Sequence, residues 1–356
     1  MINWGRGKTR IDLDEEKMRG LAERGGPLLA EEFMDNLPQR GAFQPDFKPY
    51  LLFPLLRGEE FIGFLGLGEK VKGFRYIYDE ITLLSFLSNQ LAVALVNSQL
   101  YEESLEKRRL EDELNLARQI QESLLPSSPP SLPGLEICVE SRPCRQVGGD
   151  YFDFLTTKRG ELGIAIGDVS GKGMPAALLM SSLQASLRAE VENGHPIEDT
   201  MRLVNSLLFK STTPEKFVTL FYGELNPIQK TLSYCNAGHN HPLLVHSSGR
   251  VERLERGGTI LGAFPDAQYE VGRAQLSIGD LLILYTDGVT EALNQGEEEY
   301  GEGRLLSSVV GNRELPPQEI KERILSGVRE FSDFAPPFDD LTIMVLKISE
   351  MMITKG

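Results

Sequence analysis

Aspartates occur in four short segments that each adjoin a strongly apolar, strand-like run. The segments read VGGDYFDF, IAIGDVSGKG, LYTDGVTE and FDDLTIMV. Their acidic residues of interest are Asp150, Asp153, Asp168, Asp287, Asp339 and Asp340. A carboxylate where a strand ends in a turn is exposed at a sheet edge yet held by a rigid scaffold, as binding groups commonly are. Turns also favour aspartate for structural reasons, because its side chain caps backbone amides, so each of these residues taken alone indicates a turn.

The set as a whole points to a site for a hard divalent cation. Carboxylates, backbone carbonyls and water are the ligands that Mg²⁺ and Mn²⁺ prefer. Flanking glycines, as in VGGD and IGD, would let backbone carbonyls approach an ion closely. His239 and His241 lie together in NAGHNHPLLV, a spacing that could bind a metal but more often belongs to a turn between strands. Oxygen ligands are therefore expected rather than a histidine-rich zinc site.

Composition narrows the class of protein. The 356 residues carry a net charge of −15, with 41% hydrophobic and 25% charged residues, which is typical of a globular protein with room for two domains. The charge, without any stripe of Lys and Arg, argues against nucleic acid as a partner. Cys138, Cys144 and Cys235 lack CxxC spacing, which favours a reducing compartment. No segment suggests a signal peptide or approaches the roughly 20 apolar residues of a membrane span, so we expect a cytoplasmic protein without membrane contact.

The N-terminal part predicts two strands followed by a long helix. Residues 1–48 offer only one short helical candidate, 30–37. YLLFPLLRGEEFIGFLGLGEK, from Tyr50, indicates two apolar strands around a turn at 57–59. From 79 to 125 no Gly or Pro interrupts the chain, and leucines recur at spacings of three, four and seven, which predicts one helix with a coiled-coil seam. The alternative is a single amphipathic helix that lies on its own domain.

After the breaker SSPPSLPG at 127–134 the pattern changes to short strands with grouped helices. Strands are predicted in LEICVESRPC, ELGIAIGDV, FVTLFYGELN, TLSYCNAG, PLLVHSSG, DLLILYTDG and DLTIMVLKI. Helices are predicted at 174–192, 197–210, 305–310 and 317–331. This order favours a layered α/β (α+β) sandwich over alternating βαβ units.

These motifs carry a family resemblance. GGDYFDF, GDVSGKGMPAALLMSSL, LILYTDGVTEALN and DDLTIMVLK, in this order, resemble the bacterial SpoIIE/RsbU-type branch of the metal-dependent protein phosphatase (PPM) family. AGHNHPLLV and LARQIQESLLP are similar to that branch as well. The resemblance covers about residues 115–349. It implies two packed β-sheets flanked by helices, with a two-metal centre at one end of the sandwich.

The resemblance also implies a role for each matching residue. The aspartate of GDVSG, Asp168, bridges two divalent cations, Mn²⁺ or Mg²⁺, and the backbone carbonyl of Val169 binds the second cation. Asp287 and Asp339 are ligands of the first cation. Asp150 holds metal-bound waters. Asp340 stays undecided between contact with a metal or its water and a structural role, and the role of Asp153 is undecided too. Lys172 could guide the phosphate, but we interpret it as a solvated turn lysine.

The implied activity is that of a serine/threonine protein phosphatase. Two cations about 3.5–4 Å apart lower the pKa of a bridging water that attacks the phosphoryl group, and no phosphoenzyme is needed. In agreement, the sequence contains neither a CxxxxxR phosphate loop nor a GxxxxGK[ST] motif. By family analogy the substrate is the phosphoserine or phosphothreonine of a STAS-type anti-sigma-factor antagonist. The alternatives are a non-catalytic sensor or scaffold, against which the intact acids argue, and a hydrolase of small phosphate esters.

The stretch from Leu51 to about Leu100 resembles the second half of a GAF sensory domain. The chain holds too few residues for a complete GAF domain, so a degenerate dimerisation platform fits better than an intact ligand pocket. The predicted organisation is therefore a partial GAF-like domain at 1–100, a linker helix at 101–126 and a phosphatase domain at 127–349. A homodimer through the first two parts is expected, in which the helix transmits the state of the N-terminal part to 174–187.

Overall fold

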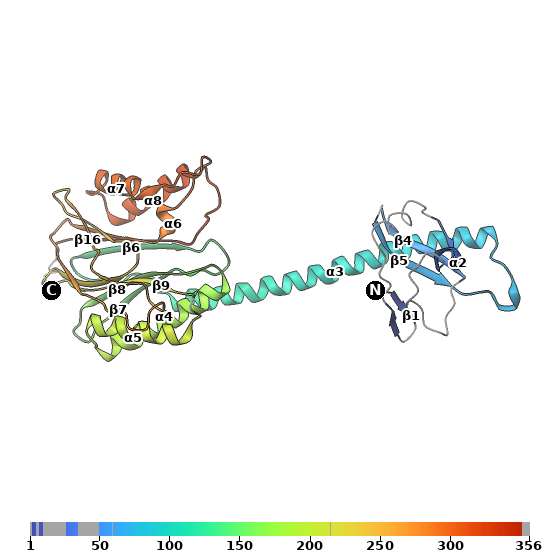
Figure 1. Ribbon diagram of the computed structural model, residues 1–356. Coiled ribbons are helices and arrows are strands. Elements are labelled where there is room, and N and C mark those ends of the chain that lie inside the picture. The colour runs from blue at the N-terminus through green and yellow to red at the C-terminus, as the bar shows by residue number, and fades with distance from the viewer. Residues whose placement is uncertain are drawn as a thin grey trace, which may run out of the picture. The chain divides into compact units, whose positions relative to one another are not determined.

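The computed structural model describes residues 2–4, 7–9, 26–34, 50–58, 60–213 and 215–350 (Figure 1). The chain divides into two compact units, Met1–Glu111 and Asp112–Gly356, which are described separately. The division falls inside the predicted linker helix.

The N-terminal unit contains two small antiparallel sheets. Its elements are β1 (Ile2–Trp4), β2 (Gly7–Thr9), β3 (Leu28–Leu29), α2 (Ala30–Met34), β4 (Leu51–Arg57) and β5 (Glu60–Leu67). Strands β1 and β2 pair with each other, whereas β3, β4 and β5 form the second sheet in that order. The predicted hairpin and short helix are confirmed, and residues 35–37 of the helical candidate lie outside the described residues. Strands β1, β2 and β3 were not predicted, because such short pairings leave no clear period-2 pattern.

One long helix follows the short 3₁₀ turn η1 (Val71–Gly73). Helix α3 runs from Tyr78 to Leu124, which confirms the predicted helix, and only Ser88 and Ala92 are buried along it. An 18-residue window of α3 reaches a mean hydropathy of 1.4, so by length and composition this helix could cross a membrane. The expectation that no segment is long and apolar enough to span a membrane was wrong by this hydropathy criterion. The criterion is weak evidence for a span, since soluble helices also meet it.

The C-terminal end of α3 packs on the second unit, to which residues from Asp112 onward belong. Leu114, Ala117 and Leu124 are half-buried, whereas Leu116 is 58% exposed. The leucine spacing that predicted a coiled-coil seam thus serves, at this end, to dock the helix on its own unit. This matches the alternative interpretation of an amphipathic helix for residues 112–124.

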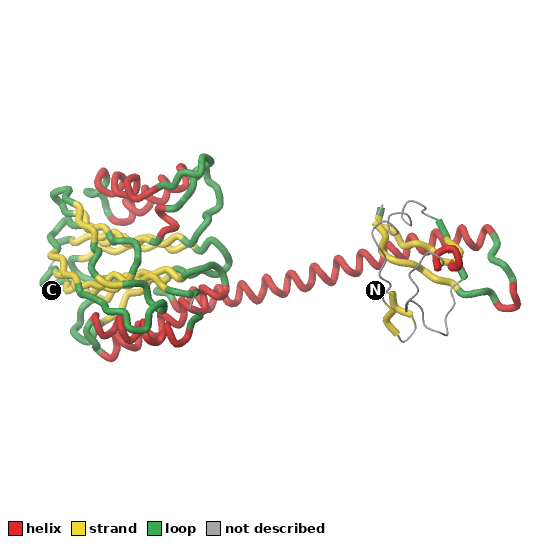
Figure 2. The backbone as a smooth tube through the Cα atoms, viewed as in Figure 1, coloured by secondary structure: helices red, strands yellow, loops and turns green. Residues whose placement is uncertain are grey.

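The second unit is a sandwich of two sheets (Figure 2). The first sheet follows the order β13-β10-β9-β8-β7, with β14 also paired to β10, and the second follows β12-β11-β15-β16-β6. The first sheet comprises β7 (Tyr151–Thr156), β8 (Leu162–Val169), β9 (Val218–Asn226), β10 (Thr231–Ala237), β13 (Gly257–Gly258) and β14 (Gly272–Gln275). The second comprises β6 (Leu135–Arg142), β11 (Leu243–Val245), β12 (Val251–Arg253), β15 (Leu281–Tyr285) and β16 (Leu341–Ile348).

Helices cover both outer faces of the sandwich, as Figure 1 shows. Helices α4 (Met174–Asn193) and α5 (Ile197–Ser211) lie against the first sheet, and α7 (Gly301–Gly311) and α8 (Pro317–Phe331) lie against the second. A one-turn helix, α6 (Asp287–Thr290), follows β15. The predicted layered α/β sandwich is confirmed.

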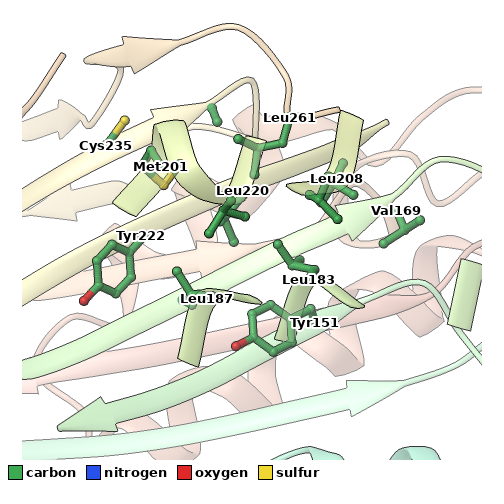
Figure 3. Packing of buried hydrophobic residues seen from close by; sticks show 14 of the residues in the cluster. Tyr151, Val169, Leu183, Leu187, Met201, Leu208, Leu220, Tyr222, Cys235 and Leu261 are labelled. Carbon is green, nitrogen blue, oxygen red and sulfur yellow. The ribbon is translucent and has the colours of Figure 1, made fainter. Parts of the chain in front are cut away.

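Three apolar cores separate the four layers. The core between the first sheet and its helices includes Leu183, Met201 and Tyr222 (Figure 3). Ile164 and Ile166 instead face the core between the sheets, because alternate residues of β8 point to opposite faces. Both faces of the central strands are therefore buried, which explains why they read as continuous apolar runs.

Asp153 joins the first sheet to α4. It lies within β7 and is fully buried, and Arg188 of α4 donates two hydrogen bonds to its carboxylate, at 2.7 and 3.0 Å. The hydroxyl of Tyr151 and the amide of Phe154 donate two more. The predicted position at the end of a strand is confirmed for Asp150, which directly precedes β7, and was wrong for Asp153, which lies inside it. Asp153 thus has a structural role.

We expect Arg188→Met to lower the free energy of unfolding by about 2–3 kcal/mol, because it leaves the carboxylate of Asp153 buried without its ionic partner. Urea unfolding of the full chain measures the change. Arg202→Met is the matched control, since Arg202 pairs with Asp199 at a surface where both side chains are about half exposed, and such pairs contribute at most about 1 kcal/mol. Equal effects of the two substitutions would contradict the structural role of Asp153.

Candidate metal centre

The inner face of the sandwich changes from apolar to polar at one end. Ile164 and Ile166 of β8 face the core between the sheets, so the alternation of the strand puts Asp168 on the same face. The same alternation applies to the other strands. Thr286 shares a face with Leu282 and Leu284 of β15, and Thr342 shares a face with Met344 of β16. Asp150 shares a face with Phe152 of β7. The polar residues in or directly beside the ends of these four strands are Asp150, Asp168, Thr286 and Thr342. They meet at one end of the sandwich because the strands are antiparallel neighbours within their sheets.

Asp168 stands near the end of β8 and is only partly buried. The backbone carbonyl of Asp168 lies 3.3 Å from the hydroxyl of Thr219 on the neighbouring strand β9. A Cβ atom at Gly149 would come within 2.9 Å of the carbonyl oxygen of Val169, so this position requires glycine. The carbonyl of Val169, the expected backbone ligand, is thereby closely approached by the segment that leads into Asp150.

Asp287 is the first residue of α6, directly after β15. Its Oδ1 atom is buried and accepts no hydrogen bond. The next residue is Gly288, where a Cβ atom would meet the carbonyl oxygen of Asp340 at 2.0 Å. The close approach of these two backbones brings Asp287 next to the acidic pair before β16.

Asp150 is buried and anchored by two threonines. Its Oδ2 atom accepts hydrogen bonds from the hydroxyls of Thr286, at 2.9 Å, and Thr342, at 2.6 Å. Its Oδ1 atom is buried without a partner. One carboxylate oxygen is therefore fixed by the protein, and the other is left for a ligand.

Asp339 and Asp340 are neighbours with different surroundings. Asp339 is partly exposed, and its carboxylate lies 2.8 Å from the ammonium group of Lys172. Asp340 is buried, and its two oxygens accept hydrogen bonds from the backbone amides of Cys144, at 2.7 Å, and Gly149, at 2.6 Å. These bonds fix the segment that carries Asp150, so the contacts of Asp340 favour the positioning of that segment over direct contact with a cation.

Lys172 contacts the loop before β16 in three ways. Besides its ion pair with Asp339, it donates a hydrogen bond of 2.6 Å to the carbonyl of Phe338 and lies 3.8 Å from the centre of that ring. The interpretation of Lys172 as a solvated turn lysine was therefore wrong. Arg145 also lies at this edge, near Gly173.

The carboxylates repel one another strongly. Burial, and then the charges of Asp287, Asp339 and Asp340, raise the pKa of Asp168 to about 8. Burial, with Glu291 and Asp339, raises the pKa of Asp287 to about 6. The pKa of Asp150 is raised well above its usual value by burial and by Asp168. Nearby acids that resist ionisation without a counter-charge form a site that favours a cation.

The residues fit a divalent metal. The donors are carboxylate oxygens and the carbonyl of Val169, and Asp150 and Asp287 each hold an unpartnered buried oxygen. This donor set suits Mg²⁺ or Mn²⁺.

Side chains of Cys144, Asp339 and Asp340 also come within 4.8 Å of one another. Both oxygens of Asp340 are bound to amides, however, and burial beside Asp340 raises the pKa of the Cys144 thiol to about 11, so the group around Asp168 is the better metal site.

His239 lies outside the acidic centre. It is buried, its Nδ1 atom lies 2.9 Å from the hydroxyl of Thr219, and Asn236 holds its backbone by two hydrogen bonds. Burial lowers the pKa of His239 to about 3, so the ring is neutral. Its surroundings match the structural role expected from the sequence.

Several supporting residues were missed by the sequence interpretation. Thr286 and Thr342 lie inside the LYTDG and DDLT motifs. They could have been found there, because each lies two residues along the chain from a buried residue of the inner face. Gln121 of α3 could not have been found from pattern alone. Its side chain donates to the carbonyl of Gly148, at 2.7 Å, and accepts from the amide of the same residue. The end of α3 is thus bonded to the segment that carries Asp150.

Comparison with known proteins agrees with this geometry. The family model for stage II sporulation protein E (SpoIIE) matches residues 158–349. The chain is 30% identical over 244 residues to "Phosphoserine phosphatase RsbU" of Bacillus subtilis, an alignment that covers 68% of this chain and 71% of that protein. It is also 30% identical over 261 residues to "Protein IcfG" of Synechocystis sp., with 66% and 41% of the two chains covered.

Solved structures share the fold. The structure of the RsbU and RsbW domains of a Mycobacterium tuberculosis protein superposes with a TM-score of 0.57 at 26% identity, over 64% of each chain. The SiaA-PP2C domain of Pseudomonas aeruginosa gives a TM-score of 0.60 at 18% identity, over 68% of this chain and 98% of that one. The family match, the relatives and the acidic centre agree: the chain belongs to the SpoIIE family of metal-dependent, PP2C-type protein serine/threonine phosphatases.

Proposed function

We propose that this chain hydrolyses phosphoserine or phosphothreonine on a signalling protein, with two divalent cations, Mn²⁺ or Mg²⁺, at the acidic centre. Asp168, Asp287, Asp339 and the carbonyl of Val169 would hold the cations. The observation that carries the proposal is the group of buried and partly buried carboxylates whose pKa values are raised by burial and by neighbouring acids, while two of their oxygens lack partners.

The chain's own residues prepare the site for hydrolysis. Divalent cations, when bound, lower the pKa of water and neutralise the charge that develops on phosphoryl oxygens. Asp150, held by Thr286 and Thr342 through its Oδ2 atom, keeps a buried Oδ1 atom without a partner and would orient a water with it. Arg145 and Lys172 stand at its edge, where they would attract a dianionic phosphate and orient its oxygens.

The substrate proposal is a phosphorylated STAS-type anti-sigma-factor antagonist. It is supported by the relative named as a phosphoserine phosphatase and by the RsbU and RsbW domains in a similar structure. The chain covers 41% of IcfG and 64% of the M. tuberculosis chain, so their further partners are not transferred to it.

Hydrolysis of p-nitrophenyl phosphate and of a phosphoserine peptide by the full chain, with and without Mn²⁺ or Mg²⁺, tests the proposed activity. We expect turnover of both esters with metal and none with a chelator. A protein that is inactive towards both esters and towards a phosphorylated STAS protein, with every metal tried, would be a non-catalytic scaffold.

We further propose that the N-terminal unit is a degenerate GAF-like platform for a cytoplasmic homodimer that regulates the phosphatase unit. Exposed apolar residues that recur every seventh position along α3, Phe86, Val93 and Leu100, support an association face. The link from Gln121 to Gly148, and a hydrogen bond of 2.7 Å from Gln184 of α4 to the carbonyl of Leu124, offer a route from the helix to the centre.

Deletion of residues 1–103 should produce a monomer whose hydrolysis rate differs from that of the full chain by about fivefold or more, with Mn²⁺ affinity retained. The reason is that the deletion removes the proposed association face but leaves Gln121 and every metal-centre residue in place. Light scattering gives the oligomeric state, and calorimetry the metal affinity. A shortened chain that stays dimeric and hydrolyses substrate at an unchanged rate would overturn the regulatory role.

A further inference from the structure

A mainly apolar groove of about 440 Å³ opens beside the metal centre. Its lining includes Asp339 and Gly288, the neighbour of Asp287, so the groove and the centre share residues. Leu293 contributes one wall, and Phe334 and Phe338 contribute another. These two phenylalanines belong to the loop between α8 and β16 and are 76% and 75% exposed.

The loop holds Phe334 in an unfavourable conformation. Asp333 and Phe334 both have positive φ angles, 49° and 58°, which is rare for residues other than glycine and a genuine outlier for a bulky side chain. Hydrogen bonds fix this turn, since the amide of Phe334 donates to the carbonyl of Arg329 at 2.9 Å. Such strain persists only where the surrounding structure enforces it, and it is concentrated at functional sites.

The rest of the loop is stiff as well. Pro336 and Pro337 restrict its backbone, and Lys172 binds the carbonyl and the ring of Phe338. The exposed aromatic rings are therefore presented by a preorganised loop, which lowers the conformational entropy lost when a partner binds. Apolar side chains placed in this way are typical of binding surfaces rather than of a surface without function.

We propose that this groove binds an apolar side chain of the phosphoprotein substrate, close in sequence to its phosphorylated serine. The inference rests on the proposed phosphatase activity and deepens it. The occupant follows from continuity: a chain whose phosphate lies at the metal centre would pass over the groove, because Asp339 and Gly288, the neighbour of Asp287, line it. A permanently bound segment in this place would cover the metal centre, whereas a substrate arrives and leaves.

The charge of one lining residue suits the same occupant. Arg329 lines the groove, and its guanidinium bonds only to the carbonyl of Leu325 of its own helix among the contacts that the described residues make. A carboxylate of the substrate could pair with it. The groove thus combines an aromatic wall with the charged side chains of Arg142, Arg329 and Glu291, beside a centre that takes a phosphate.

The test uses phosphoserine peptides of otherwise Gly, Ala and Ser composition, in which a single leucine is moved one position at a time around the phosphoserine. With the full chain and Mn²⁺, we expect leucine at one position to raise kcat/KM about tenfold over serine, mainly through KM. Phe334→Ser should remove this preference while kcat/KM for the peptide without leucine stays unchanged, because only the leucine side chain would occupy the groove.

Two variants complete the design. Phe334→Tyr should keep the leucine preference, since it retains the aromatic wall. Ile228→Ser removes an equally exposed apolar side chain from the β9–β10 turn and should also keep it. Hydrolysis of p-nitrophenyl phosphate without a leucine preference at any position, or a preference that survives Phe334→Ser, overturns the groove as a recognition site. Absence of turnover of every phosphate ester contradicts the proposed function itself and this inference with it.

Discussion

Asp168→Asn should lower kcat/KM for a phosphate ester by about a thousandfold or more. Asp168 is the residue on which the other acids converge, because Asp287, Asp339 and Asp340 all raise its pKa. An amide of the same shape keeps the packing of β8 but removes the negative charge that would hold two cations. Initial rates with p-nitrophenyl phosphate over a range of Mn²⁺ concentrations measure the effect, and calorimetry measures the loss of metal binding.

Asp266→Asn is the matched control for this loss, since Asp266 is an exposed aspartate of the same unit with no part in the centre. Its rate and metal affinity should equal those of the unaltered chain. Near-normal activity of Asp168→Asn at every Mn²⁺ concentration would show that the proposed bridging position is wrong. Asp340→Asn should lower kcat/KM less than Asp168→Asn does, because we expect it to act through the segment carrying Asp150 rather than through loss of a ligand.

The affinity for Mn²⁺ should fall by about tenfold for each pH unit below pH 8, down to about pH 6. Without metal, the carboxyl of Asp168 has a pKa of about 8 and that of Asp287 a pKa of about 6. Protons and cations therefore compete for the same oxygens in this window, and each bound cation must displace a proton. Calorimetric titration at several pH values gives the slope, and proton release can be read from buffers of different ionisation enthalpy.

The stability of the metal-free protein provides a second measurement with a definite sign. The pKa of Asp168 is raised from 3.8 to about 8 by folding, so the folded state binds more protons than the unfolded state between these values. Stability without metal should fall as the pH rises through this window, and saturating Mn²⁺ should reverse the trend, since it binds the ionised form. A metal affinity and a melting temperature that are both independent of pH from 6 to 8 would contradict the clustered carboxylates.

The sequence predicted the elements that follow from local chemistry. Helix 317–331 lies where it was expected, and the strands around Ile164 and Met344 were found because both of their faces are buried and read as apolar runs. Where pairing is short, as in β1 and β2, or where a charged residue interrupts a strand, as Asp153 does in β7, the local pattern was too weak. Asp153 is tolerated there only because Arg188, distant in sequence, neutralises it.

The sequence alone predicted which acids form one centre: the motifs around Asp150, Asp168, Asp287 and Asp339 are local, and their order is a property of the chain. Only the tertiary structure separated the neighbours. Asp340 differs from Asp339 because the amides of Cys144 and Gly149, nearly two hundred residues away, occupy its oxygens. Lys172 is no solvated lysine because the loop before β16 folds over it. Such contacts join residues that are far apart in the chain, and local sequence periodicity carries no information about them. The roles of these residues therefore depend on the tertiary structure.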